Sequence, residues 1–167
     1  MPPRNERDYT RLPGLFPPSG TRAEVMRAVV DALWLTFKDE GLSWIGFYLV
    51  NPDAPSEMVL GPSRDKPACS PIGLHGACGQ SFVSKKALVV PDIAKLGEGY
   101  IACDPRDRSE VVVPCVDVDN TCWGVLDADS YDTGAFTMHD ALCLMRLLRH
   151  TRLSHHGDER PSMVKVI

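Results

Sequence analysis

The stretch Glu110-Val-Val-Val-Pro-Cys-Val-Asp-Val-Asp-Asn-Thr-Cys-Trp-Gly-Val-Leu-Asp-Ala-Asp129 decides the fold class. It holds two runs rich in β-branched residues, 110–116 and 121–129, and the Asp119-Asn120 pair between them is typical of a turn. A connection this short can join antiparallel strands but not parallel ones. The sequence therefore predicts an antiparallel pair of strands late in the chain.

Working outward from this pair, amphipathic helices are expected on both sides of the strands. Thr21 and Glu24 have capping-box spacing and open a helix whose apolar residues recur at helical period, and Thr137 opens a last helix. Because the strands do not alternate with full-length crossover helices, the order of elements indicates an α+β domain around an antiparallel sheet. The remaining predicted elements are strands at 43–50, 58–60 and 87–90 and a short helix at 80–86.

The chain of 167 residues has the length of a single domain. Residues 1–20 are rich in proline and polar groups and are expected to form an irregular arm. Residues 21–153 hold all of the predicted helices and strands and form the domain. Residues 154–167 lack periodicity, which predicts a disordered tail.

Composition argues against several classes of function. The 22 acidic and 18 basic residues give a net charge of −4, whereas general nucleic-acid binders carry a basic excess. No apolar run approaches the roughly 18 residues of a membrane span, and the charged start of the chain lacks the apolar stretch of a secretion signal. We therefore expect a cytoplasmic protein that binds neither nucleic acid nor a membrane, with its six cysteines reduced.

Three of the cysteines lie in loops that glycine and proline interrupt. Cys69, Cys78 and Cys103 lie outside the apolar runs, and loops on a rigid scaffold are where reactive groups concentrate. The other three occur beside valine, tryptophan or leucine in predicted strands or helices and are interpreted as inert small hydrophobic residues. These are Cys115, Cys122 and Cys143.

The loop thiols allow two interpretations. Together with His75 they could bind zinc, but structural zinc sites usually contain a close Cys-x-x-Cys pair, and this chain has none. In a redox site, one thiol must ionise. Arg106 and Arg108, shortly after Cys103, are the nearest cations in sequence that could favour its thiolate.

Two strands carry aromatic or acidic side chains on one face. Because side chains alternate across a strand, Trp44 and Tyr48 share a face with Gly46 between them, and Asp127 and Asp129 share a face in the same way. The aromatic pattern fits either a small pocket with aromatic walls or an ordinary second packing surface. The acidic pattern fits either solvated carboxylates or a site for an ammonium group or a divalent ion.

These features recur together in one family. From about residue 22 to residue 148, eight segments in order resemble the free methionine-(R)-sulfoxide reductases, which are single GAF domains. Ile101-Ala-Cys-Asp104 followed by Arg108-Ser-Glu110, and then Gly124-Val-Leu-Asp-Ala-Asp-Ser130, form a combination that is specific to this group within the GAF superfamily. The segments are Trp44-Ile-Gly-Phe-Tyr-Leu49, Val59-Leu-Gly-Pro62, Lys66-Pro-Ala-Cys69, Gly76-Ala-Cys-Gly79, Leu88-Val-Val-Pro-Asp92, Ile101-Ala-Cys-Asp104, Arg108-Ser-Glu-Val-Val-Val-Pro114 and Gly124-Val-Leu-Asp-Ala-Asp-Ser130.

The resemblance implies a fold and an activity. The fold would be a GAF domain, with a central antiparallel sheet of about six strands and the N- and C-terminal helices packed on one face. The activity would be reduction of the R-sulfoxide of free methionine, not of methionine within a protein. Electrons would come from thioredoxin, no cofactor or metal would be bound, and the protein would form a homodimer.

The resemblance also implies roles for the loop thiols. Cys103 would be the nucleophile: its attack would release methionine and leave a sulfenic acid, which a second thiol condenses to a disulfide. Cys69 would be the main resolving thiol, and Cys78 a second thiol able to join the exchange. Which of these two resolves stays open.

The same resemblance places the substrate among aromatic and acidic side chains. Trp44 and Tyr48 would line the pocket for its methyl group and side chain. Glu110, Asp127 and Asp129 would hold its amino group and the polarised sulfoxide. Clustered carboxylates raise one another's pKa, so one can stay protonated as a general acid while the others offset the ammonium charge.

The alternative is a GAF module without catalytic activity, either a small-molecule binder or a thiol redox sensor. Sensor modules usually act on an attached output module, and the chain is expected to have none after its last helix. A cyclic nucleotide is a poor candidate ligand, because the predicted acidic pocket would repel its phosphate.

Overall fold

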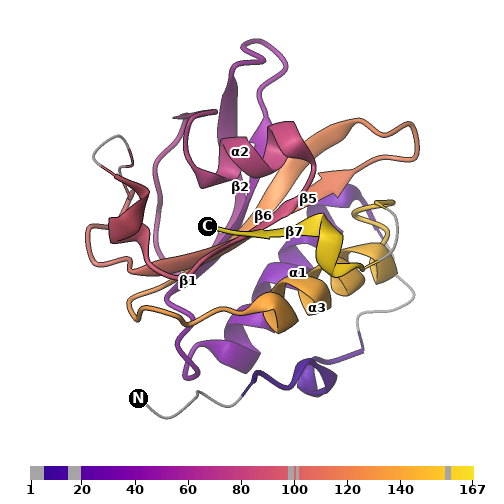
Figure 1. Cartoon of the computed structure of the whole chain (residues 1–167). Coiled ribbons are helices and arrows are strands. Elements are labelled where there is room, and N and C mark those ends of the chain that lie inside the picture. Colours follow the sequence, from indigo (N-terminus) through magenta and orange to yellow (C-terminus); the bar gives the residue numbers. More distant parts are fainter. Residues whose placement is uncertain (1–5, 15–19, 98–99, 101, 157–158) are drawn as a thin grey trace.

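The computed structural model of the chain describes residues 6–14, 20–97, 100, 102–156 and 159–167. In this part of the chain, one seven-stranded sheet lies between two layers of helices (Figure 1). The elements are η1 (Tyr9–Arg11), α1 (Arg22–Phe37), β1 (Trp44–Val50), β2 (Glu57–Arg64), β3 (Ile72–Gly73), α2 (Ala77–Ser84), β4 (Ala87–Val90), η2 (Ile93–Leu96), β5 (Ser109–Val116), β6 (Cys122–Ser130), α3 (Met138–His150), η3 (Pro161–Met163) and β7 (Val164–Val166).

The predicted antiparallel pair is confirmed as β5 and β6, two central strands of the sheet. The turn between them is closed by Asp117, whose amide donates to the Thr121 carbonyl at 2.8 Å. Asn120 has a φ of 70°, a left-handed conformation that asparagine tolerates better than most residues. The register sets Glu110 opposite Asp129, which brings two carboxyl groups to one face of the sheet.

The strand order is β3-β2-β1-β6-β5-β4-β7, and every pair is antiparallel except β4 with β7. The predicted α+β architecture around a largely antiparallel sheet is confirmed, with seven strands in place of about six. The prediction of a disordered tail at 154–167 is wrong for residues 164–166, which form β7. Within β7, Val164 is buried against the core and Lys165 is exposed. The strand pairs with β4, whose edge would otherwise be unpaired.

The N- and C-terminal helices pack on one face, as predicted. Both carry a capping box, formed by Thr21 with Glu24 in α1 and by Thr137 with Asp140 in α3. Figure 1 shows α1 and α3 side by side against one face of the sheet and α2 on the other face. The larger core fills the first interface, and a smaller apolar cluster lies under α2.

The arm before α1 is described over residues 6–14 and at residue 20, and residues 15–19 lie outside the described part. It is packed against the domain. The Arg7 side chain is 5% exposed and its guanidinium pairs with Asp140 at 3.1 Å, and the Tyr9 hydroxyl donates to the same carboxylate at 2.7 Å. The irregular arm predicted at 1–20 therefore contains an ordered segment with a 3-10 turn.

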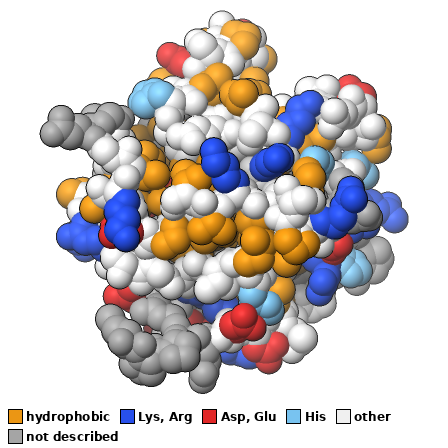
Figure 2. All heavy atoms as spheres, in the orientation of Figure 1, with side chains coloured by type: hydrophobic (Ala, Val, Ile, Leu, Met, Phe, Trp, Pro, Cys, Tyr) orange, Lys and Arg blue, Asp and Glu red, His pale blue; other side chains and the backbone are white. Residues whose placement is uncertain are grey.

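Two surface properties bear on function. In the described part of the chain, the helices are too short or too polar to cross a bilayer. The face that carries α2 and β7 shows hydrophobic side chains mixed with Lys and Arg (Figure 2). Exposed hydrophobic residues of these two elements are Val83 and Val166, at 67% and 55% exposure.

Candidate functional site

A cavity of about 300 Å³ lies between the sheet, α2 and the loops that precede β3 and β5. We call it the site cavity. It brings together residues from four stretches that are far apart in sequence, 44–48, 68–78, 100–110 and 127–129. All eight predicted site residues line it, and they are Trp44, Tyr48, Cys69, Cys78, Cys103, Glu110, Asp127 and Asp129.

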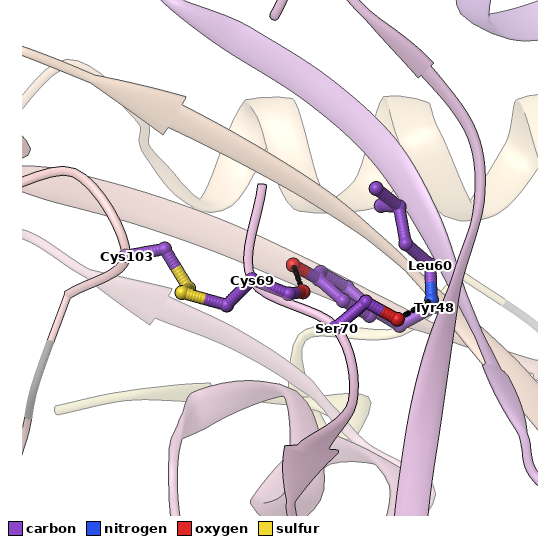
Figure 3. The surroundings of a disulfide bond; sticks show 5 residues. All are labelled: Tyr48, Leu60, Cys69, Ser70 and Cys103. Atoms are coloured by element: carbon purple, nitrogen blue, oxygen red, sulfur yellow. Dashed lines mark hydrogen bonds between the residues drawn. A yellow bond between two sulfur atoms is a disulfide. The ribbon is translucent and has the colours of Figure 1, made fainter. Parts of the chain in front are cut away.

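Two of the predicted thiols form a disulfide in the wall of the cavity. Cys69 and Cys103 are joined, with their Cα atoms 5.6 Å apart (Figure 3). The Tyr48 hydroxyl donates to the Cys69 carbonyl at 2.8 Å, and the Leu60 amide donates to the Ser70 hydroxyl at 3.0 Å. These bonds tie the Cys69 loop to β1 and β2. The expectation that all six cysteines are reduced is wrong for this pair.

Cys78 faces the same cavity from the first turn of α2 but, unlike Cys69 and Cys103, it is a free thiol. Its side chain is buried. Burial first, and then the charges of Asp127, Glu110 and Asp129, raise the pKa of the Cys78 thiol well above its ordinary value. A thiolate is the attacking form in disulfide exchange, so this environment disfavours attack by Cys78.

The remaining cysteines lie away from the site cavity, as the sequence predicts. Cys115 and Cys122 are buried on β5 and β6, and Cys143 is partly buried on α3. Burial raises the pKa of each of these thiols, which keeps them protonated and unreactive.

Three carboxyl groups form the floor of the cavity, and we call Glu110, Asp127 and Asp129 the carboxyl cluster. Their nearest oxygen atoms lie within 4.8 Å of one another. Burial raises the pKa of all three, and for the two aspartates the charges of the neighbouring cluster carboxylates raise it further. The cluster can therefore hold a proton near neutral pH and still attract a cation.

The carboxyl cluster also has a spacing that suits a metal ion, because carboxylate oxygens are the ligands that hard divalent cations prefer. An ammonium group satisfies the same oxygens. The zinc interpretation of the cysteines fits less well, since the disulfide consumes two of the sulfurs that it requires.

The aromatic wall comes from the predicted face of β1. The Trp44 and Tyr48 ring centroids lie 6.0 Å apart, and the Trp44 indole donates to the Lys66 carbonyl at 2.9 Å. A Cβ atom on Gly46 would lie 2.4 Å from the indole, so glycine at this position makes room for the ring. Both aromatic side chains are buried, and they belong to the apolar cluster under α2.

Sequence reasoning missed two titratable residues that line the cavity, Tyr100 and Asp107. The Tyr100 hydroxyl donates to Glu110 at 2.5 Å. Asp107 is 7% exposed, and burial, followed by the charge of Asp104, raises the pKa of its carboxyl to about 6. Both lie in the loop before β5, where the sequence has no periodicity that could indicate which side chains turn inward.

The predicted cationic partners of Cys103 have other contacts. Arg106 pairs with Asp104 at 2.9 Å, and Arg108 donates to the carbonyls of Pro105 and Asp107. Neither guanidinium lines the site cavity. The suggestion that they favour the Cys103 thiolate gains no support from this arrangement.

Comparison with known proteins finds a matching family model and similar proteins from other organisms. Residues 21–151 match the GAF domain family model. The chain is 34% identical over 120 residues to a free methionine-R-sulfoxide reductase of Saccharomyces cerevisiae, covering 70% of this chain and 66% of that protein. It is 39% identical over 109 residues to the enzyme of the same name in Escherichia coli, covering 64% and 62%. These matches span slightly less than two thirds of each relative's length.

A solved structure agrees over a longer stretch. The free methionine-R-sulfoxide reductase of Neisseria meningitidis, in complex with its substrate, superposes with a TM-score of 0.71 and 33% identity. The likeness covers 82% of this chain and 81% of that one.

Proposed function

The chain belongs to the GAF domain family and, within it, to the free methionine-R-sulfoxide reductases; on that premise we propose that it reduces free L-methionine (R)-S-oxide to methionine. One observation carries the proposal. A disulfide between two loops closes one wall of a cavity whose floor is a cluster of buried carboxyl groups and whose other wall is aromatic.

The proposed cycle begins with the reduced protein. The Cys103 thiolate attacks the sulfoxide sulfur, whose oxygen takes up a proton, and a Cys103–sulfur bond forms. The hydroxyl group then transfers to the Cys103 sulfur as this bond and the S–O bond to the methionine sulfur break, so that Cys103 becomes a sulfenic acid and methionine leaves with the electron pair. The Cys69 thiol then attacks the sulfenic sulfur, water leaves, and the two cysteines form a disulfide. The dithiol of thioredoxin reduces this bond by exchange and returns both thiols. The disulfide-bonded structure corresponds to the oxidised end of this cycle.

The carboxyl cluster supplies what the first step needs. Protonation of the sulfoxide oxygen makes the sulfur electrophilic and weakens the S–O bond, and a carboxyl whose pKa is raised can donate that proton near neutral pH. The ionised members offset the ammonium group of a free amino acid. A methionine residue within a peptide lacks this ammonium, which gives the proposed preference for the free amino acid.

The proposed partners and compartment follow from the same chemistry. Thioredoxin is the proposed electron donor, the cytoplasm is the compartment that keeps such thiols reduced, and no bound cofactor takes part. We also propose a homodimer. Dialysis against EDTA should leave the turnover rate unchanged, because no step uses a metal ion.

The decisive experiment measures NADPH consumption through thioredoxin reductase and thioredoxin, with the separated R and S sulfoxides of free methionine as substrates. We expect turnover of the R form only, and none in the Cys103→Ser variant. That variant should still bind methionine, since the carboxyl cluster and aromatic wall remain. Methionine binding by the unmodified protein without turnover of either sulfoxide would favour the alternative of a ligand-binding or redox-sensing module.

A further inference from the structure

Asp107 is a buried acidic residue that the proposed cycle does not use. It lies on the same loop as Cys103, four residues further on, and it lines the site cavity. Its amide donates to the Asp104 carbonyl at 3.0 Å, which fixes the backbone so that this side chain turns inward. The site therefore contains a fourth carboxyl group beside the three of the carboxyl cluster.

The hydrogen bonding of Asp107 is incomplete. Among the residues that the structure describes, four buried side-chain polar atoms have no hydrogen-bond partner, and two of these are Oδ1 of Asp107 and Oδ1 of Asp127. Both of these residues line the site cavity, and they are 7% and 6% exposed. A buried acceptor without a donor lowers the stability of the ligand-free site, so both oxygens favour a ligand that brings N–H groups.

The two oxygens come from different elements, Asp107 from the loop before β5 and Asp127 from β6. A single group that satisfies both must carry more than one donor. An ammonium group has three N–H donors and a positive charge, whereas the sulfoxide and the methyl group of the proposed substrate have no donor at all. Rotation about χ2, which is broad for aspartate, turns either oxygen toward a ligand.

Resting on the proposed function, we propose that Asp107 is a substrate-binding residue that, with Asp127, forms the subsite for the amino group of free methionine sulfoxide. The remaining members of the carboxyl cluster, Glu110 and Asp129, are then free to face the sulfoxide oxygen. Asp107 thus contributes to selectivity for a free amino acid.

The charge of Asp107 makes this contact dependent on pH. With a pKa of about 6, Asp107 is mostly ionised at pH 7.5 and mostly protonated at pH 5. We therefore expect the KM for the ammonium-bearing substrate to rise as the pH falls through 6. The charged or titratable groups that influence Asp107 or are influenced by it are Lys66, Asp104, Arg106, Glu110, Asp127 and Asp129.

The test compares Asp107→Asn with the unmodified protein in the thioredoxin-coupled assay, at pH 7.5 and at pH 5.5. The substrates are free L-methionine (R)-S-oxide and (R)-4-(methylsulfinyl)butanoate, which lacks only the amino group. We expect the variant to raise the KM for the amino acid about tenfold or more at pH 7.5. Its KM for the deamino compound should be unchanged, and its KM for the amino acid should rise less on acidification.

The matched control is Asp119→Asn, which removes one carboxylate at the exposed β5–β6 turn and should change neither KM. An equal effect of Asp107→Asn on both substrates would show a merely structural role and overturn the proposal. An unchanged KM for the amino acid would do the same.

Failure of the proposed reductase activity gives a different result, because no variant would then turn over either substrate. In that event, calorimetric measurement of L-methionine binding decides whether Asp107 belongs to the ammonium subsite. Binding that is weakened about tenfold or more by Asp107→Asn would keep the ammonium subsite, and binding that is absent or unaffected would overturn it.

Discussion

Tyr48 illustrates how a single residue serves both the fold and the site. Its ring forms part of the aromatic wall, and its hydroxyl holds the carbonyl of Cys69 at 2.8 Å. Burial raises the pKa of this hydroxyl, so it stays protonated and remains a donor. The bond fixes the loop that presents the Cys69 sulfur to Cys103 (Figure 3).

The two candidate resolving thiols should therefore differ in their effect. We expect Cys69→Ser to stop steady turnover with thioredoxin but to allow about one methionine to be released per protein, because Cys103 can still attack once. Cys78→Ser should keep steady turnover, since the Cys78 thiol is buried and its pKa is raised. Chromatographic measurement of methionine at excess protein separates the two outcomes. Steady turnover by Cys69→Ser would assign resolution to another thiol.

Gly46 offers a second test at the residue scale. A Cβ atom there would lie 2.4 Å from the Trp44 ring and 2.8 Å from the Ser63 side chain, so Gly46→Ala must displace the indole. We expect about 1–3 kcal/mol lower free energy of unfolding in urea and a weaker affinity for methionine.

The matched control is Gly14→Ala, because a Cβ atom at Gly14 meets nothing within 4 Å. This change should leave stability and affinity unchanged. A Gly46→Ala variant with normal affinity and an unaltered near-ultraviolet spectrum of tryptophan would contradict the assignment of Trp44 to the binding wall.

At the scale of elements, regular patterns made the central strands predictable. The Asp119-Asn120 pair required a tight turn, and alternation along β1 separated the cavity face from the core face. By contrast, Asp107 lies within Asp-Pro-Arg-Asp-Arg, residues 104–108, a composition that is typical of an exposed loop. Only the path of the backbone, fixed by contacts distant in sequence, determines which of its charges is buried. The short β7 was missed because three residues carry too little periodicity.

The sequence also shows no sign that the segment before α1 is ordered, because a buried ion pair between residues distant in sequence holds it against the domain. Arg7 donates to the Ala135 and Glu40 carbonyls, both at 2.8 Å, and pairs with Asp140, which also caps α3. Removal of the arginine would leave a carboxylate buried without its cation.

We therefore expect Arg7→Ala to lower the free energy of unfolding by about 3–5 kcal/mol, measured by urea denaturation. Arg11→Ala serves as the control, because both side chains of the Arg11–Glu40 pair are exposed and its loss should lower the free energy of unfolding far less. Equal, small losses in both variants would show that the arm contributes little to stability.

For the whole molecule, the two faces of the sheet have different tasks. The face under α1 and α3 buries the larger apolar core, and the face under α2 combines a smaller apolar cluster with buried carboxyl groups. Buried carboxylates cost stability, so the second face depends on the first for its structure. This division is what allows a small domain to keep four acidic side chains in one cavity.

The pH dependence of stability should reveal that cost. Acidic groups whose pKa is raised by folding hold more protons in the folded than in the unfolded protein, so stability falls as the pH rises from about 4 through their folded pKa values. The pKa of Asp107 is raised to about 6 and those of Asp127 and Asp129 well above their ordinary values. Each extra proton contributes about 1.4 kcal/mol per pH unit.

We therefore expect the ligand-free protein to be more stable in urea at pH 6 than at pH 8. Asp129→Asn should reduce this difference by removing one titrating group, and the exposed Asp119→Asn should not. Methionine should raise the melting temperature more at pH 8 than at pH 6, because its ammonium group offsets carboxylates and raised pKa values leave fewer of these carboxyl groups ionised at the lower pH. Stability that rises from pH 6 to pH 8 would mean that the carboxyl cluster is already ionised at pH 6, and that a carboxyl of this cluster cannot be the proton donor to the sulfoxide.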